Sequence, residues 1–259
     1  MKLLNNLKTS VKLITSFVIV AVISLIIAAI GYLNMKSIND SMTSMYFDRL
    51  VPASQIGQVN QSLYTIRGDV FKSILIPAES QTSYTTIETQ TKNIDTLIAK
   101  YKASNLLDTE KVELAIFDPA WAEYKAAFTD SINLSKSGDQ AAAIKSLLTG
   151  GRTSNARKAV GASAEKLQAI NIQAGEALNT EADSTFANSV KLLLIISAIG
   201  FLLALMLGIV ISSSISKPLG LLVNIANSVS NGDLVRDLDE KTKDSVRLRK
   251  DEVGDIGKA

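Results

Sequence analysis

Two long windows without a charged residue constrain the fold of this chain more than any other feature. Residues 13–35 and residues 192–216 contain no Asp, Glu, Lys or Arg, and a lysine stands at both ends of each window. At about 1.5 Å of rise per residue, a helix over either window covers the roughly 30 Å hydrocarbon core of a bilayer. We therefore predict two transmembrane helices, one over each window.

Each window has an alternative interpretation. The first follows Lys2, Lys8 and Lys12, as a cleaved signal peptide would, but a signal peptide has an apolar region of only about 7–15 residues. The second could be a buried core helix, but no soluble core helix needs so long an uncharged run. The lengths favour an uncleaved anchor and a true span.

The flanking charges predict the orientation in the membrane. The first twelve residues hold three lysines and no acid, and Lys217 follows the second window. Because positive charge is retained in the cytoplasm, we expect both termini to be cytoplasmic, in a two-pass protein of the inner or plasma membrane. The segment between the windows then faces the periplasm or the extracellular medium.

The overall composition argues against several classes of function. The chain has 27 Lys and Arg against 25 Asp and Glu, a net charge of +2, which gives no reason to expect a nucleic-acid partner. It has no cysteine and no histidine, and so lacks thiolate chemistry and the commonest general base and metal ligand. We expect no catalytic residues, no metal site and no cofactor, and thus no enzyme.

The segment between the windows carries apolar residues at steps of three and four, the spacing of one face of an α-helix. The turn-forming stretches "PAES", "SNLLD" and "SKSGD" to "TGGRTSN" separate four such stripes. We therefore predict an all-α protein with an antiparallel four-helix bundle outside the membrane. The stripes are Ile56, Val59, Leu63, Ile66, Val70 and Ile74; Tyr84, Ile87, Thr91, Ile94, Ile98 and Tyr101; Val112, Ile116, Phe117, Trp121, Tyr124, Phe128 and Ile132; and Val160, Ala164, Leu167, Ile170, Ala174 and Leu178.

Prolines and aromatic residues of the bundle have structural interpretations. Trp121, Tyr124 and Phe128 at helical spacing favour core packing over a ligand cage. Pro52 predicts a tolerated kink in the first helix, and Pro119 either kinks the third helix or begins a new segment with Asp118 as its cap.

The first and fourth stripes continue into the two windows without an obvious stop. A displacement within the bundle could thus enter the bilayer as a piston movement, a tilt or a rotation of a continuous helix. This arrangement suits the transmission of a signal.

A further apolar repeat with heptad spacing follows the second window, at Leu219, Leu222, Ala226 and Val229. One helix cannot bury this heptad seam, so we predict a partner helix, most simply that of a second copy in a homodimer. Pro218 cannot donate a hydrogen bond to the Ser214 carbonyl, which predicts a kinked or restarted helix and a softened joint.

After this heptad repeat, the sequence predicts a turn, a charged connector and a new helix. Gly232 is expected to end the first helix with a positive φ. The connector "DLVRDLDEKTKDSVRLRK" has apolar anchors at Leu234, Leu238 and Val246, and "DEVGDIGKA" opens the new helix with acids in its first turn.

The outer segment resembles the four-helix-bundle sensor domain of methyl-accepting chemotaxis proteins. The resemblance rests on "YFDRLVPASQIGQVNQSLYTIRGDVFKSIL" (46–75), "FDPAWAEYKAAF" (117–128) and "SGDQAAAIKSLLTG" (137–150), in this order along the chain. It implies a receptor that senses a small solute and controls chemotaxis through a cytoplasmic output.

The segment after the second window is similar to a HAMP linker, two short helices that dimerise into a parallel four-helix coiled coil. The matching motifs are Ser216-Lys217-Pro218-Leu219, Gly232-Asp233-Leu234 and Asp251-Glu252-Val253-Gly254. The connector is longer than expected, and the second helix is cut short, so we expect an N-terminal fragment of a longer receptor or a truncated reading frame. The output domain that would contact the chemotaxis kinase and its adaptor is absent from this sequence.

The resemblance also implies a ligand site. Related receptors hold the carboxylate of an amino or organic acid with distal basic residues of the first helix, a placement that Arg67 and Lys72 match, and Arg157 begins the fourth helix at the same end. A guanidinium there can bind a carboxylate bidentately. The ordinary alternative for each residue is a solvated charge on an exposed helix face.

Together these predictions give a transmembrane chemoreceptor, with the sensory half of a sensor histidine kinase or a nucleotide cyclase as the alternative. The predicted divisions are residues 1–12 in the cytoplasm, 13–35 and 192–216 across the membrane, 36–190 as the outer sensor bundle and 217–259 as the HAMP segment.

Overall fold

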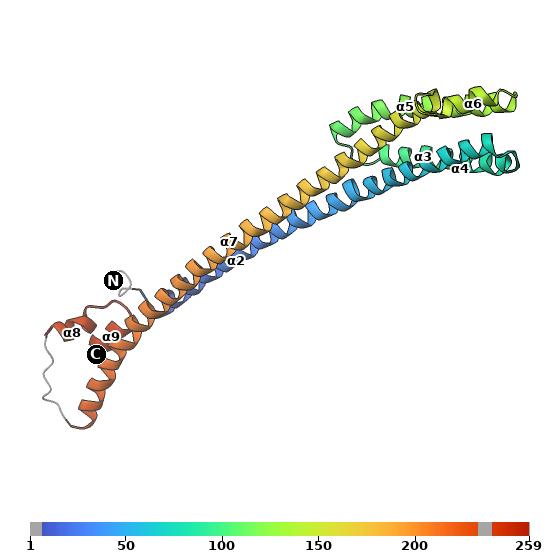
Figure 1. The fold of residues 1–259 in the computed structure, drawn as a ribbon. Helices are drawn as coiled ribbons and strands as arrows, with labels where there is room; N and C mark the ends of the chain where they lie inside the picture. The colour runs from blue at the N-terminus through green and yellow to red at the C-terminus, as the bar shows by residue number, and fades with distance from the viewer. Residues whose placement is uncertain (1–6, 233–239, 259) are drawn as a thin grey trace. The chain divides into compact units, whose positions relative to one another are not determined.

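All regular elements among residues 7–232 and 240–258, the part that the computed structural model describes, are helices (Figure 1). The all-α prediction is confirmed. In chain order they are α2 (Thr9–Ser44), the π-helical turn η1 (Met45–Leu50), α3 (Val51–Leu75), the 3₁₀ turn η2 (Pro77–Glu79), α4 (Ser80–Lys102), α5 (Asp108–Lys136), α6 (Gln140–Leu147), α7 (Arg152–Ser230), α8 (Glu240–Arg247) and α9 (Glu252–Lys258).

The chain divides into two compact units. Ser37–Thr185 form one, which we call the bundle unit. Met1–Lys36 and Phe186–Ala259 form the other, which we call the window unit because it contains both charge-free windows.

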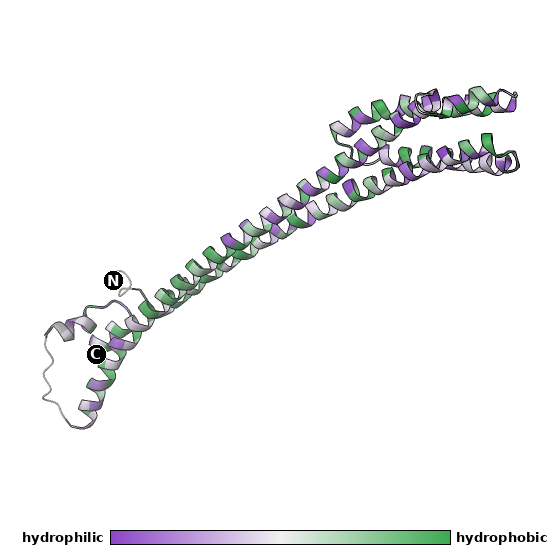
Figure 2. Cartoon of the chain, in the orientation of Figure 1, coloured by the Kyte–Doolittle hydropathy of each residue, from purple (hydrophilic) through white to green (hydrophobic). Residues whose placement is uncertain are grey.

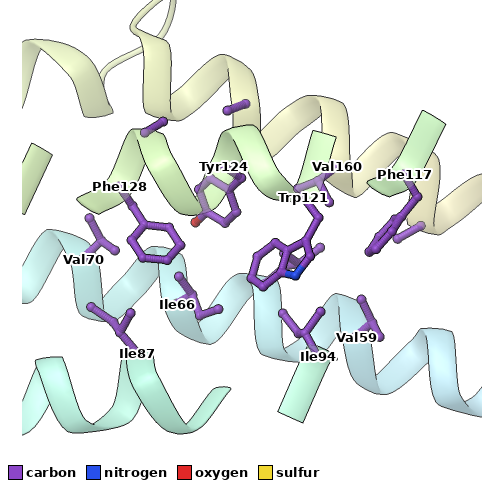
Figure 3. Packing of buried hydrophobic residues seen from close by; sticks show 14 of the residues in the cluster. Val59, Ile66, Val70, Ile87, Ile94, Phe117, Trp121, Tyr124, Phe128 and Val160 are labelled. Carbon is purple, nitrogen blue, oxygen red and sulfur yellow. The ribbon is translucent and has the colours of Figure 1, made fainter. Parts of the chain in front are cut away.

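The bundle unit is an antiparallel four-helix bundle, as predicted. A short turn at η2 joins α3 to α4, and α6 connects α5 to the first part of α7. One cluster of buried side chains takes residues from all of these helices (Figure 3).

The predicted stripe of α3, most of that of α4 and the first half of that of α7 form this core, whereas Ile170, Ala174 and Leu178 of α7 are only partly buried. All six stripe residues of α3 are buried, and so are Ile87, Ile94, Ile98 and Tyr101 of α4. Val160, Ala164 and Leu167 of α7 are completely buried. Phe117, Trp121, Tyr124 and Phe128 of α5 belong to the same cluster, and their rings point toward α3 (Figure 3). The structural interpretation of the aromatic residues is therefore confirmed.

The prediction for the start of the apolar stripe of α5 is wrong. Val112 and Ile116 are 65% and 51% exposed, whereas Leu114 is buried and continues to Phe117 at a step of three. The buried face of the first α5 turns also holds Glu110 and Glu113. The apolar pattern failed here because two of the inward positions carry acids.

Local chemistry explains the turn between α5 and α6. Gly138 adopts a φ of 94°, which glycine reaches without the steric cost of a Cβ atom. The Asp139 side chain then accepts a hydrogen bond from the Ala142 amide at 3.0 Å and caps α6.

Three of the four prolines, Pro52, Pro119 and Pro218, lie within helices, and Pro77 begins the turn η2. α5 runs without interruption through Pro119, so the predicted alternative of a new segment capped by Asp118 is wrong; Asp118 instead pairs with Lys102 at 2.7 Å. Pro52 follows the wide turn of η1, in which the Val51 amide donates to the Tyr46 carbonyl. α7 also continues through Pro218, and no restart occurs there.

Two helices of the chain are long and apolar enough to span a membrane. Their most hydrophobic stretches have mean hydropathies of 3.0 and 2.9 and are 0% and 6% buried, which argues against a buried core helix for the second window (Figure 2). Within the window unit, α2 and α7 touch closely: a Cβ atom on Gly200 would lie 3.0 Å from Ile23 Cγ2.

The end of the chain folds back on itself within the window unit. The predicted helix at "DEVG" is present as α9, and the connector contains α8, which the sequence did not indicate. Val246 is buried as predicted, and a Cβ atom on Gly257 would lie 2.4 Å from its Cγ1 atom. Leu234 and Leu238 lie outside the described residues.

The corrected register of α5 can be tested with matched truncations. Leu114→Ala removes a buried side chain and is expected to lower the free energy of unfolding by about 2–5 kcal/mol. Val112→Ala removes an exposed one and should change it by less than about 0.5 kcal/mol. Denaturant unfolding followed by the fluorescence of Trp121, the single tryptophan, measures both. Equal losses would contradict the register.

Candidate functional site

A small hollow near the distal end of the bundle brings two predicted ligand residues together. Arg67 of α3 and Arg157 of α7 both line it, together with Tyr124 of α5 and Ser154 near the start of α7. Its volume is about 10 Å³, which holds about one water molecule. The hollow can therefore receive one small polar group, while the rest of a ligand would lie outside it.

Each arginine lies against an aromatic ring. The Arg67 guanidinium carbon is 5.8 Å from the centre of the Phe71 ring, and that of Arg157 is 5.4 Å from the centre of the Tyr64 ring. Such contacts orient the planar groups without neutralising their charge. Within the described residues, neither arginine has a carboxylate partner within 4 Å.

The electrostatics of the hollow are positive. Burial raises the pKa of the Tyr124 phenol, and the charges of Arg157 and Arg67 oppose that rise. The phenol is thus a neutral donor in a hollow that two cations also line. This set of groups suits a carboxylate or another small oxyanion.

Lys72 does not join this set. Its side chain is exposed and lies 3.8 Å from the Asp69 carboxylate one turn before it. Most other basic residues of the bundle unit are paired in the same way. The pairs are Lys92 with Glu88, Lys102 with Asp118, Lys111 with Asp108, Lys125 with Asp95, Arg152 with Glu123 and Asp130, and Lys166 with Glu113.

A buried polar cluster lies at the opposite end of the bundle, and the sequence analysis missed it. Glu110 is fully buried and accepts hydrogen bonds from Arg49 Nη1 at 2.9 Å and from Asn171 Nδ2 at 2.7 Å. The Tyr101 hydroxyl also donates to this carboxylate, and burial together with this bond raises the pKa of Tyr101. The Glu110 side chain further accepts from the Leu107 amide at 2.7 Å, at the start of α5.

The sequence offered only half of the signal for this last contact. A glutamate at the third position of a helix can accept from the N-cap amide, but the usual signature also has Ser, Thr, Asp or Asn at the N-cap. In "LDTE" that position is Leu107, so the pattern alone does not identify Glu110 as a capping residue. Its pairing with Arg49, 61 positions earlier, has no local signature.

A second buried charge cluster lies in the window unit and includes two predicted residues. Asp251 accepts from Lys12 Nζ at 2.8 Å and from Arg249 Nε at 2.9 Å, and all three side chains are buried. Next to it, Glu252 accepts from the backbone amide and the hydroxyl of Thr9 at 2.9 and 3.0 Å. The predicted Asp-Glu motif thus binds the residues that precede the first window.

The electrostatics of this cluster favour the ionised acid. Hydrogen bonds from Arg249 hold the pKa of Asp251 well below its usual range, against the effect of burial, and Lys12 and the Gly254 amide add to the lowering. Because the pKa of Asp251 is lower in the folded than in the unfolded chain, its ionised carboxylate stabilises the fold. This stabilisation is complete above the pKa of aspartate in the unfolded chain, near 3.9, and is lost as the pH falls through the lower pKa of the folded chain.

Arg249 also reaches the carbonyl that Pro218 leaves without a backbone donor. Its Nη2 atom donates to the Ser214 carbonyl oxygen at 3.0 Å. The gap in the α7 hydrogen-bond ladder is therefore filled by a side chain from the turn before α9.

Among the other predicted residues of this region, Gly232 has the predicted conformation. Gly232 has a φ of 81°, just beyond the end of α7, which confirms the predicted positive φ. A Cβ atom on Gly254 would lie 2.2 Å from the Arg249 carbonyl oxygen, so only glycine fits. Leu219 and Val229 are 44% and 52% exposed, Ala226 is exposed and Leu222 is partly covered.

Comparison with known proteins agrees with this architecture. Residues 6–186 match the family described as a four-helix bundle sensory module for signal transduction. A proposed sensory transducer protein of Acetivibrio thermocellus is 24% identical over 160 residues, which cover 62% of this chain. The match spans 28% of the length of that curated relative.

The chain belongs to the family of four-helix-bundle sensory modules for signal transduction, because the match covers most of its length. It is a sensory module of the chemoreceptor type.

The charge cluster of the window unit can be tested at Asp251. Asp251→Ala leaves Lys12 and Arg249 buried without their carboxylate, and we expect a loss of about 3 kcal/mol in local stability. Amide hydrogen exchange of the full chain should become faster in residues 249–258 and stay unchanged in the bundle. Asp255→Ala, which removes only an exposed pair with Lys258, is the control. Similar exchange in both variants would refute the role of the cluster.

Proposed function

We propose that this chain is the sensory and transmembrane part of a chemoreceptor, and that it binds a small organic anion between α3 and α7. The observation that carries this proposal is the pair Arg67 and Arg157. They come from two helices, face one hollow and lack acidic partners, whereas most basic residues of the bundle unit are paired.

The chemistry of the hollow supports a carboxylate as the recognised group. Two guanidinium groups supply planar, bidentate donors, and the Tyr124 hydroxyl supplies a neutral one. The exposed ring of Tyr64 and the half-buried ring of Phe71 lie beside the arginines, where they can contact the body of an amino or organic acid. The small volume implies that Arg67 and Arg157 move apart when such a ligand binds.

One helix links the proposed ligand site to the proposed output side. α7 contains Arg157, the second window and Pro218. A shift of the helix at Arg157 can therefore reach the HAMP segment, residues 217–259, without crossing a loop. The family of sensory modules supports this non-enzymatic, transmitting role.

The membrane arrangement is part of the proposal. Residues 13–35 and 192–216 would cross the inner or plasma membrane, with 36–190 outside and both termini in the cytoplasm. The contacts of Thr9 and Lys12 with Glu252 and Asp251 support one common side for the two ends of the chain. A homodimer would cover the exposed seam from Leu219 to Val229, and an output domain would carry the signal to a chemotaxis kinase and its adaptor.

Anion binding can be tested with single arginine variants. Arg67→Ala and Arg157→Ala should each weaken binding of amino and organic acids by about tenfold or more, because each removes a charge-assisted hydrogen bond. Calorimetric titration of the full chain in lipid nanodiscs measures the affinities. Lys158→Ala, one residue beyond Arg157 and exposed, is the matched control, and Lys72→Ala should have little effect because Asp69 already pairs with Lys72. An acid panel that fails to bind the unaltered chain would refute the proposed ligand class.

The proposed dimer can be tested by disulfide cross-linking. Single cysteines placed from Leu219 to Val229 in this cysteine-free chain should cross-link most at Leu219, Leu222, Ala226 and Val229. Membranes oxidised before solubilisation give the yields. Cross-linking yields that do not peak at these heptad positions would refute the HAMP-like seam.

A further inference from the structure

The bundle unit contains a second concave site, far from Arg67 and Arg157 along both helices. It is a groove of about 630 Å³ between the η1–α3 segment and α7. This volume lies within the range of about 300–1,000 Å³ that is typical of small-molecule sites. We call it the proximal groove, because its residues are closer in sequence to the charge-free windows than those of the distal hollow.

The walls of the proximal groove are largely apolar. Met45, Leu50 and Ala53 line one side, and Ile172 lines the other. The π-helical turn η1 supplies Met45 and Leu50, and single π turns within helices are frequent at functional sites. Gly175 keeps the opposite wall open, since a Cβ atom there would lie 3.7 Å from Arg49 Cβ and would narrow the groove without a clash.

The charges of the proximal groove differ from those of the distal hollow. Arg49 is at its base, but this guanidinium already donates to Glu110 at 2.9 Å and to the Asn105 carbonyl at 3.2 Å. Glu176 also lines the groove, and no cation pairs with its carboxylate among the described residues. The uncompensated charge is therefore negative, which disfavours an anion and favours an amine.

A buried acceptor at the groove marks a place for a donor. Asn171 lines the groove and is 1% exposed. Its Nδ2 atom donates to Tyr101, Glu110 and the Leu167 carbonyl, but its Oδ1 atom is buried without a hydrogen-bond partner. Oδ1 and Nδ2 diverge from the same carbon, so this oxygen is turned away from the Glu110 carboxylate. Buried polar atoms are normally satisfied, and an incoming N–H group would satisfy this one.

We propose that the proximal groove binds a small amphipathic amine. The ammonium group pairs with Glu176 and donates to Asn171 Oδ1 after a small side-chain movement, and the apolar body packs against Met45, Leu50 and Ile172. This site is separate from the anion site proposed above and of opposite charge preference.

Three probes with the same phenylethyl body and different head groups test this proposal. Phenethylamine carries a positive charge, N-acetylphenethylamine is neutral and hydrocinnamate is negative. Calorimetric titration of the full chain in lipid nanodiscs, with empty nanodiscs subtracted, should show the tightest binding for phenethylamine and the weakest for hydrocinnamate.

Two variants assign the binding to the groove. Gly175→Leu fills it and should weaken phenethylamine binding by about tenfold or more. Ala177→Leu introduces the same side chain at an exposed position of α7 and should leave phenethylamine binding unchanged. Glu176→Gln should weaken phenethylamine by about fivefold, the effect of one charge at contact distance in water, and should spare the acetylated probe. Glu181→Gln, exposed on the same helix, is its control.

Several outcomes would overturn the proposal. These are equal phenethylamine binding by Gly175→Leu and Ala177→Leu, preferential binding of hydrocinnamate in the groove, or loss of phenethylamine binding in Arg67→Ala. Weaker self-association of Gly175→Leu without any binding of phenethylamine would assign the groove to a second copy of the chain. Should Gly175→Leu fail to reproduce the unfolding transition of Trp121, Glu176→Gln alone decides. A failure of anion binding at Arg67 and Arg157 leaves all of these results interpretable, because the two sites share no residue.

Discussion

The apolar contact between α3 and α7, which we call the apolar column, fixes the positions of Arg67 and Arg157 relative to the core. Ile66 and Val70 on α3 and Val160 on α7 are fully buried, and each successive residue of a helix is rotated by about 100° from the one before. Arg67, next to Ile66, and Arg157, one turn before Val160, must therefore lie at the edge of the column. Their approach at one hollow is a consequence of the core register.

Polar side chains lie at both ends of the apolar column. The two ends differ in the groups that satisfy the hydrogen bonds of these side chains. At the distal end, the hydroxyl of Thr153 bonds to those of Ser131 and Ser146, so neutral groups satisfy one another there. At the other end, Arg49 and Glu110 bring opposite charges into the interior, with Tyr101 and Asn171 as further partners. A buried pair of this kind contributes little net stability, but the loss of one partner is costly, which fixes the relative position of the helices that carry it.

The limits of sequence prediction in this chain follow from the distance between partners. The apolar stripes of α3, α4 and α7 were predictable because helical periodicity is a local property. The start of α5 was not, since Glu110 and Glu113 occupy inward positions and are compensated by Arg49 and by Ser163, 61 and 50 residues away. An exposed Val112 and a buried Glu113 can be distinguished only when those partners are known.

The residues after the second window show the same difference between features set locally and features that depend on distant partners. The conformation of Gly232 could be predicted from the sequence, because a positive φ demands glycine at the residue itself, whereas the close approach of the Arg249 carbonyl to Gly254 is visible only in the structure. The partner of the Ser214 carbonyl could not be predicted either, because Arg249 lies 35 residues further along the chain. The candidate ligand residues show an intermediate case: Arg67 and Arg157 meet as the helix pattern suggested, whereas Lys72 is paired with Asp69, and only the structure distinguishes them.

The contact between Arg249 and Ser214 changes how Pro218 should be understood. A proline within a helix removes one backbone hydrogen bond, and by itself this would make the joint softer and would dissipate a displacement. Here the freed carbonyl is held by a guanidinium that also binds Asp251, and Asp251 in turn holds Lys12. A movement of α7 at this point is therefore opposed by the start of α9 and by the residues before the first window. On the proposed function, Pro218 does not loosen the connection: it exposes an acceptor through which α7 is coupled to the rest of the window unit.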